Sequence, residues 1–250
     1  MKLPIVDIHN HLLPGVDDGF REVSHSIQAI RAMAENGCRE LIFTPHMNPD
    51  VYSDESEAHF REVYKGFSAM IPESFGIKTS LAAEYMVVQG FEDRAEHPEE
   101  LLTMPDGSIL VEMSYYFRSE NMEQALFNLN IAGLKPIIAH PERYLYMSSC
   151  LGDFDKFKDI GCRFQMNLAS LTGKYGPHSI KILCHLLDEG MYDFVATDLH
   201  SNPQLYNILE SEPVPKVRRS FEKFLARTGV CGLVNEPASE SFLSRLFHRS

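Results

Sequence analysis

The sequence predicts an α/β fold in which seven strand-then-helix units close, or nearly close, into a distorted barrel of parallel strands. Short apolar runs alternate with amphipathic helical stretches along the chain, which is typical of parallel βα units. The length of 250 residues suits a single α/β barrel. Residues with unusual chemistry recur at the carboxyl end of one apolar run after another. Such ends meet at one mouth in a barrel but spread along a line in an open doubly wound sheet, which is the less favoured alternative.

The first strand is predicted at the amino terminus, where an apolar, partly β-branched run leads into His9. Six more strands are predicted at 40–46, 78–88, 108–114, 135–140, 162–167 and 193–200. Helices are predicted from apolar residues at helical spacing, often with a glycine stop, at 24–36, 54–70, 120–132, 153–160, 180–189 and 215–227. Residues 92–102 are expected to form a short helix or a loop, and the tail carries a short helical pattern at Phe242, Leu243 and Leu246. Because no low-complexity linker interrupts the chain, residues 1–250 are interpreted as one domain.

The composition excludes several classes of function. A formal net charge of −12 argues against a nucleic-acid or anionic-membrane partner, since no basic excess exists to neutralise phosphates. No apolar run approaches the ~18 residues of a membrane span, and no signal-peptide core follows Met1. The five cysteines form no Cys-x-x-Cys pair and begin no Cys-x5-Arg loop, so neither a redox motif nor a cysteine-nucleophile phosphatase is indicated. Free thiols and the absence of these signals predict a cytoplasmic protein.

The candidate metal ligands are imidazoles and carboxylates at the ends of the predicted strands. His9 and His11 are two positions apart on a strand and therefore project to the same face. After a Pro14-Gly15 turn the chain can fold back over that face, and of Asp17 and Asp18 the second is favoured as a ligand. The full set of predicted ligands is His9, His11, Asp18, His46, Glu84, Glu112, His140, Asp198 and His200. Nine ligands are too many for one ion and enough for two or three, and mixed imidazole and carboxylate ligation favours Mn, Fe or Zn.

This set of residues suits phosphoester hydrolysis. Glu84 and Glu112 are candidates to bridge two cations, and such a cluster lowers the pKa of a bridging water toward neutrality. Arg143 follows His140 by three positions and could hold two phosphoryl oxygens with its planar guanidinium. Asp7 is predicted to orient a ligand histidine from behind. The group that protonates the leaving oxygen is left open between water and a histidine of the site.

Taken in order, these motifs resemble a known family. Asp7-Ile-His-Asn-His11, the Asp17-Asp18-Gly19 turn and Ala-Thr-Asp198-Leu-His200 are similar to the PHP superfamily of metal-dependent phosphoesterases. Together with His140-Pro-Glu-Arg143-Tyr144, they more specifically resemble the bacterial protein-tyrosine phosphatases of capsule and exopolysaccharide loci, the CpsB/CapC family, from about Val6 to His200.

The resemblance implies a distorted seven-stranded barrel with a three-metal site, often manganese. It implies one metal on His9, His11, Glu84 and Asp198, a second on Glu84, Glu112 and His140, and a third on Asp18, His46 and His200. Arg143 would then bind the phosphate. The implied substrate is phosphotyrosine in the tail of a cytoplasmic tyrosine autokinase that controls polysaccharide polymerisation and export.

The chain lacks basic residues at two places where the family pattern has them. Family members carry basic residues after the histidine of the second strand and an arginine after the last Asp-x-His, where this chain has Met47-Asn48-Pro49 and Ser201-Asn202-Pro203-Gln204.

Three other functions stay open. A small-molecule phosphatase of the histidinol-phosphatase type is one alternative. A non-catalytic metal-dependent scaffold that binds a kinase tail is another. A C–N hydrolase of the amidohydrolase type is less favoured, because its middle strand often carries a modified lysine and here carries Glu112. The oligomeric state is not predicted.

Overall fold

The computed structural model of the chain describes residues 1–48, 50–52, 56–88, 90–119 and 121–228. The helical pattern predicted at Phe242, Leu243 and Leu246 lies outside these residues. Among the described residues, every helix is too short or too polar to cross a membrane.

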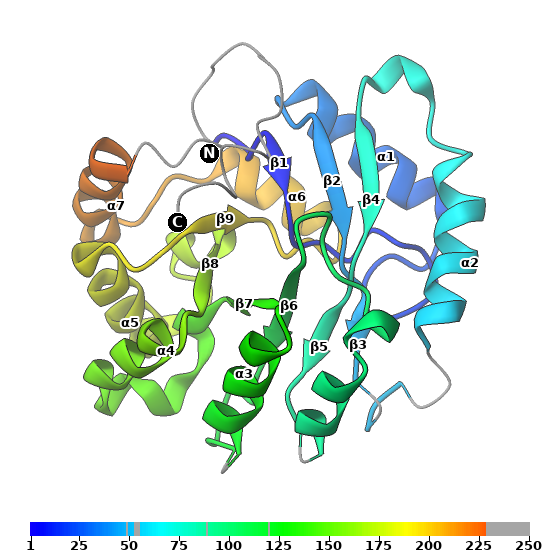
Figure 1. Ribbon diagram of the computed structural model, residues 1–250. Helices are drawn as coiled ribbons and strands as arrows, with labels where there is room; N and C mark the ends of the chain where they lie inside the picture. The colour runs from blue at the N-terminus through cyan, green and yellow to red at the C-terminus, as the bar shows by residue number, and fades with distance from the viewer. Residues whose placement is uncertain (49, 53–55, 89, 120, 229–250) are drawn as a thin grey trace.

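Nine parallel strands in two sheets form the centre of the described chain (Figure 1). The smaller sheet has the order β1-β2-β4, with β1 at Val6–Asp7, β2 at Glu40–Phe43 and β4 at Lys78–Leu81. The larger sheet has the order β3-β5-β6-β7-β8-β9. Its strands are β3 (His46–Met47), β5 (Glu84–Met86), β6 (Ser108–Glu112), β7 (Lys135–Ala139), β8 (Arg163–Asn167) and β9 (Phe194–Ala196). The predicted α/β class with parallel strands is therefore confirmed.

Two of the predicted strands pass from the smaller sheet into the larger one. The run at 40–46 breaks after Phe43 into β2 and β3, and the run at 78–88 breaks after Leu81 into β4 and β5. Pro45 has no N–H to donate to a ladder, which explains the first break. After the breaks, β3 and β5 pair with each other as parallel neighbours, with His46 opposite Glu84. The breaks thus carry two candidate ligands to adjacent positions.

The first and last strands also meet at their carboxyl ends. An isolated parallel bridge joins Asn10 to Leu199. The His11 N–H donates to the Leu199 carbonyl at 2.9 Å, and the Asp198 N–H donates to the His9 carbonyl at 2.8 Å. These bonds bring the His9-x-His11 segment beside the Asp198-x-His200 segment. The described strands still form two sheets and not one closed barrel, so the barrel itself is not confirmed.

Helices cover the outside of the sheets (Figure 1). They are α1 (Val23–Glu35), α2 (Glu57–Ser68), α3 (Met122–Ile131), α4 (Phe154–Ile160), α5 (Gly176–Glu189), α6 (Asn202–Glu210) and α7 (Pro215–Thr228). Short 3-10 turns complete the connections: η1 (Glu73–Phe75), η2 (Phe91–Glu96), η3 (Pro98–Glu100), η4 (Pro141–Arg143), η5 (Leu145–Ser149), η6 (Leu151–Asp153) and η7 (Leu168–Thr172).

Helix α6 was not predicted, although its start carries a recognisable signal. The Ser201 hydroxyl accepts from the Gln204 N–H, and Pro203 occupies the first turn. A serine cap followed by proline in the first turn is a common way to begin a helix.

A small apolar cluster between the two sheets supports the functional end of the molecule. It contains Val6, Ile8, Ile42, Ala82, Met104, Leu110, Ile137, Ala139, Phe194 and Ala196. On β6, Leu110 belongs to this cluster and Glu112 lies two residues further on, so the two side chains share a face. Ala82 and Glu84 have the same spacing, as do Ala196 and Asp198. Three of the predicted carboxylates, Glu84, Glu112 and Asp198, therefore each lie two positions beyond a residue of this apolar cluster.

Candidate metal centre

The innermost group of candidate ligands surrounds one oxygen of Glu84 and one of Asp198. His9 Nε2 lies 3.1 Å from Glu84 Oε2 and 3.4 Å from Asp198 Oδ1. His11 Nε2 lies 3.4 Å from the same glutamate oxygen and 3.3 Å from the same aspartate oxygen. Ligand atoms about 2.0–2.2 Å from a common ion lie roughly 3 Å from each other. The four side chains that the family resemblance assigns to one metal are thus gathered with the spacing that a metal requires.

A second group forms around Glu84 and Glu112, where His46 takes a larger part than expected. His140 Nε2 lies 3.1 Å from Glu84 Oε1 and 3.9 Å from Glu112 Oε2. His46 Nδ1 lies 3.1 Å from Glu84 Oε2 and 3.0 Å from Glu112 Oε1. The compact three-residue group here is therefore His46, Glu84 and Glu112, whereas His140 groups with His9 and Asp198.

The third group lies nearer the surface and includes the more exposed Asp18. His46 Nε2 and His200 Nε2 lie 3.5 and 3.6 Å from Asp18 Oδ1. The ring of His11 stacks on His200 with centroids 3.9 Å apart. His11, Asp18, His46 and His200 can all offer a ligand atom to one point. All nine side chains predicted from the sequence are thus drawn into one connected cluster.

An unsatisfied buried oxygen of Glu84 indicates that these side chains fit a divalent cation. Glu84 Oε2 is buried and makes no hydrogen bond within the described residues. The ring nitrogens of His9, His11 and His46 nevertheless lie 3.1 to 3.4 Å from that oxygen. A buried carboxylate oxygen without a donor is costly unless a cation satisfies it. A metal ion that binds these rings and the carboxylate together removes the conflict.

The protonation states of the metal-free cluster are set by the close approach of its carboxylates and imidazoles. Burial alone would raise the pKa of Glu84, but the neighbouring His9 and His46 hold it well below its usual range. Burial is likewise outweighed at Asp198, where His9 and His200 keep the pKa well below normal. Burial and the adjacent His11 lower the pKa of His200 to about 4, so that its imidazole is neutral near pH 7. Burial and the adjacent His11 would lower the pKa of His46, but Glu84 and Glu112 outweigh them and raise it to about 10, and the pKa values of His9 and His11 are raised as well. Because metals bind ionised carboxylates and neutral imidazoles, a cation that binds these three rings would displace their protons.

Two side chains orient the first pair of histidines from behind, and Asp7 is not one of them. His9 Nδ1 lies 2.8 Å from Gln165 Oε1, and His11 Nδ1 lies 2.7 Å from Asp17 Oδ2. Asp7 instead accepts from the Thr197 N–H at 2.9 Å and from its hydroxyl at 2.7 Å. The predicted role of Asp7 was therefore wrong. Gln165 was missed, although a glutamine inside the apolar run of β8 was a signal that could have been followed.

Arg143 is held at the edge of the cluster by a carboxylate and two aromatic rings. Its Nη1 donates to Asp198 Oδ2 at 2.8 Å. Its guanidinium carbon lies 4.4 Å from the ring centroid of Tyr115 and 4.5 Å from that of Tyr175. Burial would lower the pKa of Arg143, but Asp198 outweighs it and raises the pKa, so the side chain stays charged. Arg143 is thus a fixed cation whose position is set by its neighbours.

Asn167 connects the arginine side of the site to the metal side. Its Nδ2 donates to Asp198 Oδ2 at 2.7 Å and to the Tyr175 hydroxyl at 3.2 Å. Its backbone N–H donates to the buried Glu142 at 2.9 Å. Because Asn167 and Arg143 both bind Oδ2, the other oxygen of Asp198 is turned toward the histidines. Asn167 was not among the predicted site residues.

The cluster opens into a pocket of about 220 Å³. Its lining combines candidate ligands and Arg143 with apolar and aromatic side chains: Asp18, His46, Asn48, Val51, Tyr52, Met86, Glu112, Tyr115, Arg143, Asp198 and His200. The Tyr115 hydroxyl donates to Glu112 Oε2 at 3.1 Å, so this ring belongs to the pocket as well as to the packing around it. The pocket is therefore lined by both ionic groups and aromatic rings.

One lysine lies near Arg143 and Asp198. Lys174 Nζ lies 5.3 Å from the centroid of Tyr175, the ring that also contacts Arg143. Burial lowers the pKa of Lys174, Asp198 raises it and Arg143 lowers it again. The ammonium is therefore within electrostatic reach of the site.

Two of the candidate ligands have backbone conformations that are rare for their residue types. His140 has a φ of 32° and Asp198 a φ of 49°. Such left-handed conformations cost about 1–3 kcal/mol each and persist where the surrounding structure enforces them. Both residues directly follow or closely follow a strand end, where the bend turns their side chains into the cluster.

Comparison with known proteins agrees with this geometry. Residues 5–218 match the family described as "Capsular polysaccharide synthesis, CpsB/CapC". The chain is 29% identical over 218 residues to "Tyrosine-protein phosphatase YwqE" of Bacillus subtilis (strain 168), with 87% of this chain and 85% of the relative covered. It is 25% identical over 206 residues to "Putative tyrosine-protein phosphatase CapC" of Staphylococcus aureus, covering 79% of this chain and 77% of the relative.

A solved structure has the same fold. It is described as "Crystal structures of YwqE from Bacillus subtilis and CpsB from Streptococcus pneumoniae, unique metal-dependent tyrosine phosphatases". It superimposes with a TM-score of 0.73 at 26% identity, and the match covers 91% of this chain and 89% of that chain. Because the family match spans most of the sequence, the chain belongs to the CpsB/CapC family of capsular polysaccharide synthesis.

Proposed function

We propose that this chain is a metal-dependent protein-tyrosine phosphatase, and that residues 1–250 form a single PHP-type domain with a distorted barrel. The observation that carries the activity is the position of Arg143 beside a cluster of nine metal-type side chains, five of which line the same pocket as Arg143. The relatives named as tyrosine-protein phosphatases support the same reaction. The bridge between Asn10 and Leu199 supports the barrel, since it joins the first strand to the last.

In this proposal each side chain has a defined task. His9, His11, Glu84 and Asp198 would hold one divalent ion, and the remaining five candidate ligands would hold one or two more, with Mn favoured and Fe or Zn possible alternatives. Bound metals would supply a hydroxide nucleophile at neutral pH and neutralise charge on the phosphoryl group. Arg143 binds phosphoryl oxygens, and its contact with Asp198 fixes its direction before substrate arrives. The small apolar cluster between the two sheets keeps bulk water out from that side of the site.

The proposed substrate is phosphotyrosine in a protein, and the proposed partner is the tail of a cytoplasmic tyrosine autokinase of a capsule or exopolysaccharide locus. Aromatic side chains at the pocket wall support a phenyl ester as the substrate. The Tyr52 ring lies nearly parallel to His46, with centroids 6.1 Å apart, and Tyr115 lines the pocket beside Arg143. A flat phenyl ring fits between such side chains.

The test is phosphate release from a tyrosine-phosphorylated peptide after chelator treatment and reconstitution with Mn. We expect Mn-dependent release, and a loss of about 10²–10³-fold in Arg143→Ala, as for removal of a preorganised donor to transition-state charge. Arg31→Ala is the matched control, because Arg31 is exposed on α1 and pairs only with Glu35 among the contacts described. Turnover of small phosphate monoesters without turnover of the peptide would favour a small-molecule phosphatase. Mn binding without any phosphate release would favour the scaffold alternative.

A further inference from the structure

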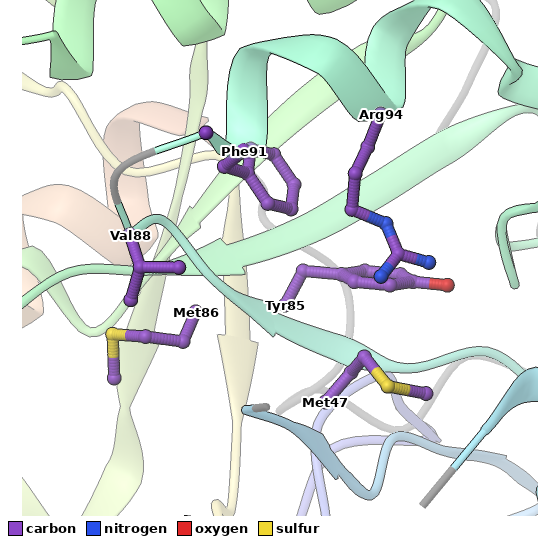
Figure 2. A pocket seen from close by; sticks show the side chains of 7 residues that line it. Met47, Tyr85, Met86, Val88, Phe91 and Arg94 are labelled. Carbon is purple, nitrogen blue, oxygen red and sulfur yellow. The ribbon is translucent and has the colours of Figure 1, made fainter. Parts of the chain in front are cut away.

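A second pocket lies beside the metal centre, between β3, β5 and η2. Its volume is about 120 Å³. Figure 2 shows its lining, with Phe91 and Arg94 on one side and the side chains of β5 and Met47 on the other. The complete lining is Met47, Tyr85, Met86, Val88, Gly90, Phe91 and Arg94. No candidate metal ligand belongs to this lining, so the pocket would bind a different part of a ligand than the metal centre does.

Strand β5 connects this pocket to the metal centre. Glu84 begins the strand among the candidate ligands, and Met86 lies two residues further along the same face. Met86 lines both the metal pocket and the second pocket. A substrate residue seated over Glu84 would therefore have its neighbour beside Met86, at the entrance to the second pocket.

The interior of the second pocket offers apolar contact and little else. Arg94 is ion-paired with Glu57, and its guanidinium carbon lies 5.3 Å above the Tyr85 ring (Figure 2). The Tyr85 hydroxyl donates to Glu57 at 3.2 Å and accepts from the Leu102 N–H at 2.7 Å. The charged and hydroxyl groups at the wall are thus already bonded within the protein. Thioether, isopropyl and phenyl groups remain to contact a ligand, which favours an apolar one.

The size of the pocket limits the ligand to one side chain. Its volume of about 120 Å³ is slightly below that of the engineered ~150 Å³ cavity that accepts benzene. A leucine, isoleucine or methionine side chain fits such a space, whereas a second residue does not.

We propose that this pocket is a specificity subsite for one apolar side chain that flanks the phosphotyrosine in an extended peptide substrate. The inference rests on the proposed phosphatase activity and adds the sequence preference of the same site. The metals and Arg143 bind the phosphate, and the pocket beyond Met86 selects the neighbouring residue. Burial of an aliphatic side chain in such a pocket gives about 10- to 100-fold discrimination against glycine in kcat/KM.

The test uses the full-length, Mn-loaded protein with phosphotyrosine peptides that carry leucine or glycine immediately before or immediately after the phosphotyrosine. We expect one of the two leucine peptides to be hydrolysed about 10- to 100-fold more efficiently than its glycine counterpart. Val88→Trp fills the pocket from a half-buried wall position, and it should remove this preference while leaving turnover of p-nitrophenyl phosphate unchanged. Ile131→Trp, on the exposed face of α3, is the matched control and should keep the preference.

Each outcome is decisive. Equal hydrolysis of leucine and glycine peptides by the unmodified protein overturns the subsite, whatever the behaviour of the variants. A leucine preference that survives Val88→Trp in protein that still hydrolyses p-nitrophenyl phosphate also overturns it. Absence of phosphate release from every phosphotyrosine peptide would instead refute the proposed function, so the two failures are distinguishable.

Discussion

Replacing Asn167 by alanine tests whether Asp198 is positioned by the network described above. The substitution removes the 2.7 Å hydrogen bond to Asp198 Oδ2, the 3.2 Å bond to Tyr175 and the 2.8 Å bond that Asn167 Oδ1 accepts from the Ala169 N–H at the start of η7. It keeps the backbone N–H that donates to Glu142. Asn167 itself neither lines the pocket nor belongs to the predicted metal ligands, and its side chain reaches that set at Asp198. We therefore expect its effect on metal binding to act through the aspartate.

The magnitude follows from the kind of bond that is lost. A hydrogen bond to a charged group contributes about 1.5–3 kcal/mol. Loss of an outer partner of a metal ligand typically lowers metal affinity or activity about 10- to 100-fold, which is the same range of free energy. We therefore expect Asn167→Ala to weaken Mn binding about 10- to 100-fold and to lower kcat/KM for p-nitrophenyl phosphate by a similar factor.

The assay is calorimetric Mn titration combined with steady-state kinetics at saturating Mn. Asn130→Ala is the matched control, since the Asn130 amide donates to the Ile160 carbonyl far from the cluster in sequence and contact. A double-mutant cycle with Arg143→Ala sharpens the test, because both side chains bind the same oxygen of Asp198. Effects on kcat/KM should then be strongly non-additive. Unchanged Mn affinity in Asn167→Ala, or fully additive losses, would refute the positioning role.

Three further predictions concern the whole molecule and the rim of the site. Removal of Mn with a chelator should lower the free energy of unfolding, because a bound cation would stabilise the buried Glu84 cluster. The expected loss is about 2.7 kcal/mol relative to protein in Mn at 100 times its Kd. Equal urea midpoints with and without Mn would contradict this. Lys174→Ala should raise KM a few-fold with kcat unchanged, and the effect should be clearest at low salt. Lys181→Ala is the control and should leave KM unchanged, since Lys181 donates to the Ser148 carbonyl away from the pocket. Burial raises the pKa of the Cys162 thiol from 9.0 to about 12, so the folded state holds this proton more tightly. The contribution of this proton to stability should therefore be complete below pH 9 and fall by roughly 1.4 kcal/mol per pH unit from there to about pH 12. Equal free energies of unfolding in urea at pH 8 and pH 10.5 would contradict this.

The metal-type residues could be predicted from the sequence because parallel topology brings strand ends together. His140 and Glu112 each follow an apolar run, and a βα alternation is enough to place such ends at one edge. His9 and His11 lie just beyond the end of β1, and both rings still meet Glu84, as their spacing of two predicted. For these residues the position in the strand-helix repeat was enough to predict which other strand-end side chains would lie nearby.

The remaining features depend on contacts between segments that are distant along the chain. Gln165 lies 156 residues from His9, and nothing in either segment indicates that the two side chains meet. The division of two predicted strands between two sheets depends on Pro45 and on pairing with the first strand, which an apolar run does not reveal. The role predicted for Asp7 failed because Thr197, a neighbour only in the folded chain, supplies its hydrogen bonds.

The left-handed backbone at His140 and Asp198 has a consequence for how this protein can change. Glycine adopts such a conformation without strain, so replacement of either residue by glycine would relieve backbone energy while deleting a candidate metal ligand. Asp198→Gly would also lose the hydrogen bonds from Arg143 and Asn167, so the gain is expected at His140 alone. The metal-free form of His140→Gly should resist urea better than the metal-free parent. Stability and turnover therefore oppose each other at His140, whereas at Asp198 the same side chain serves both.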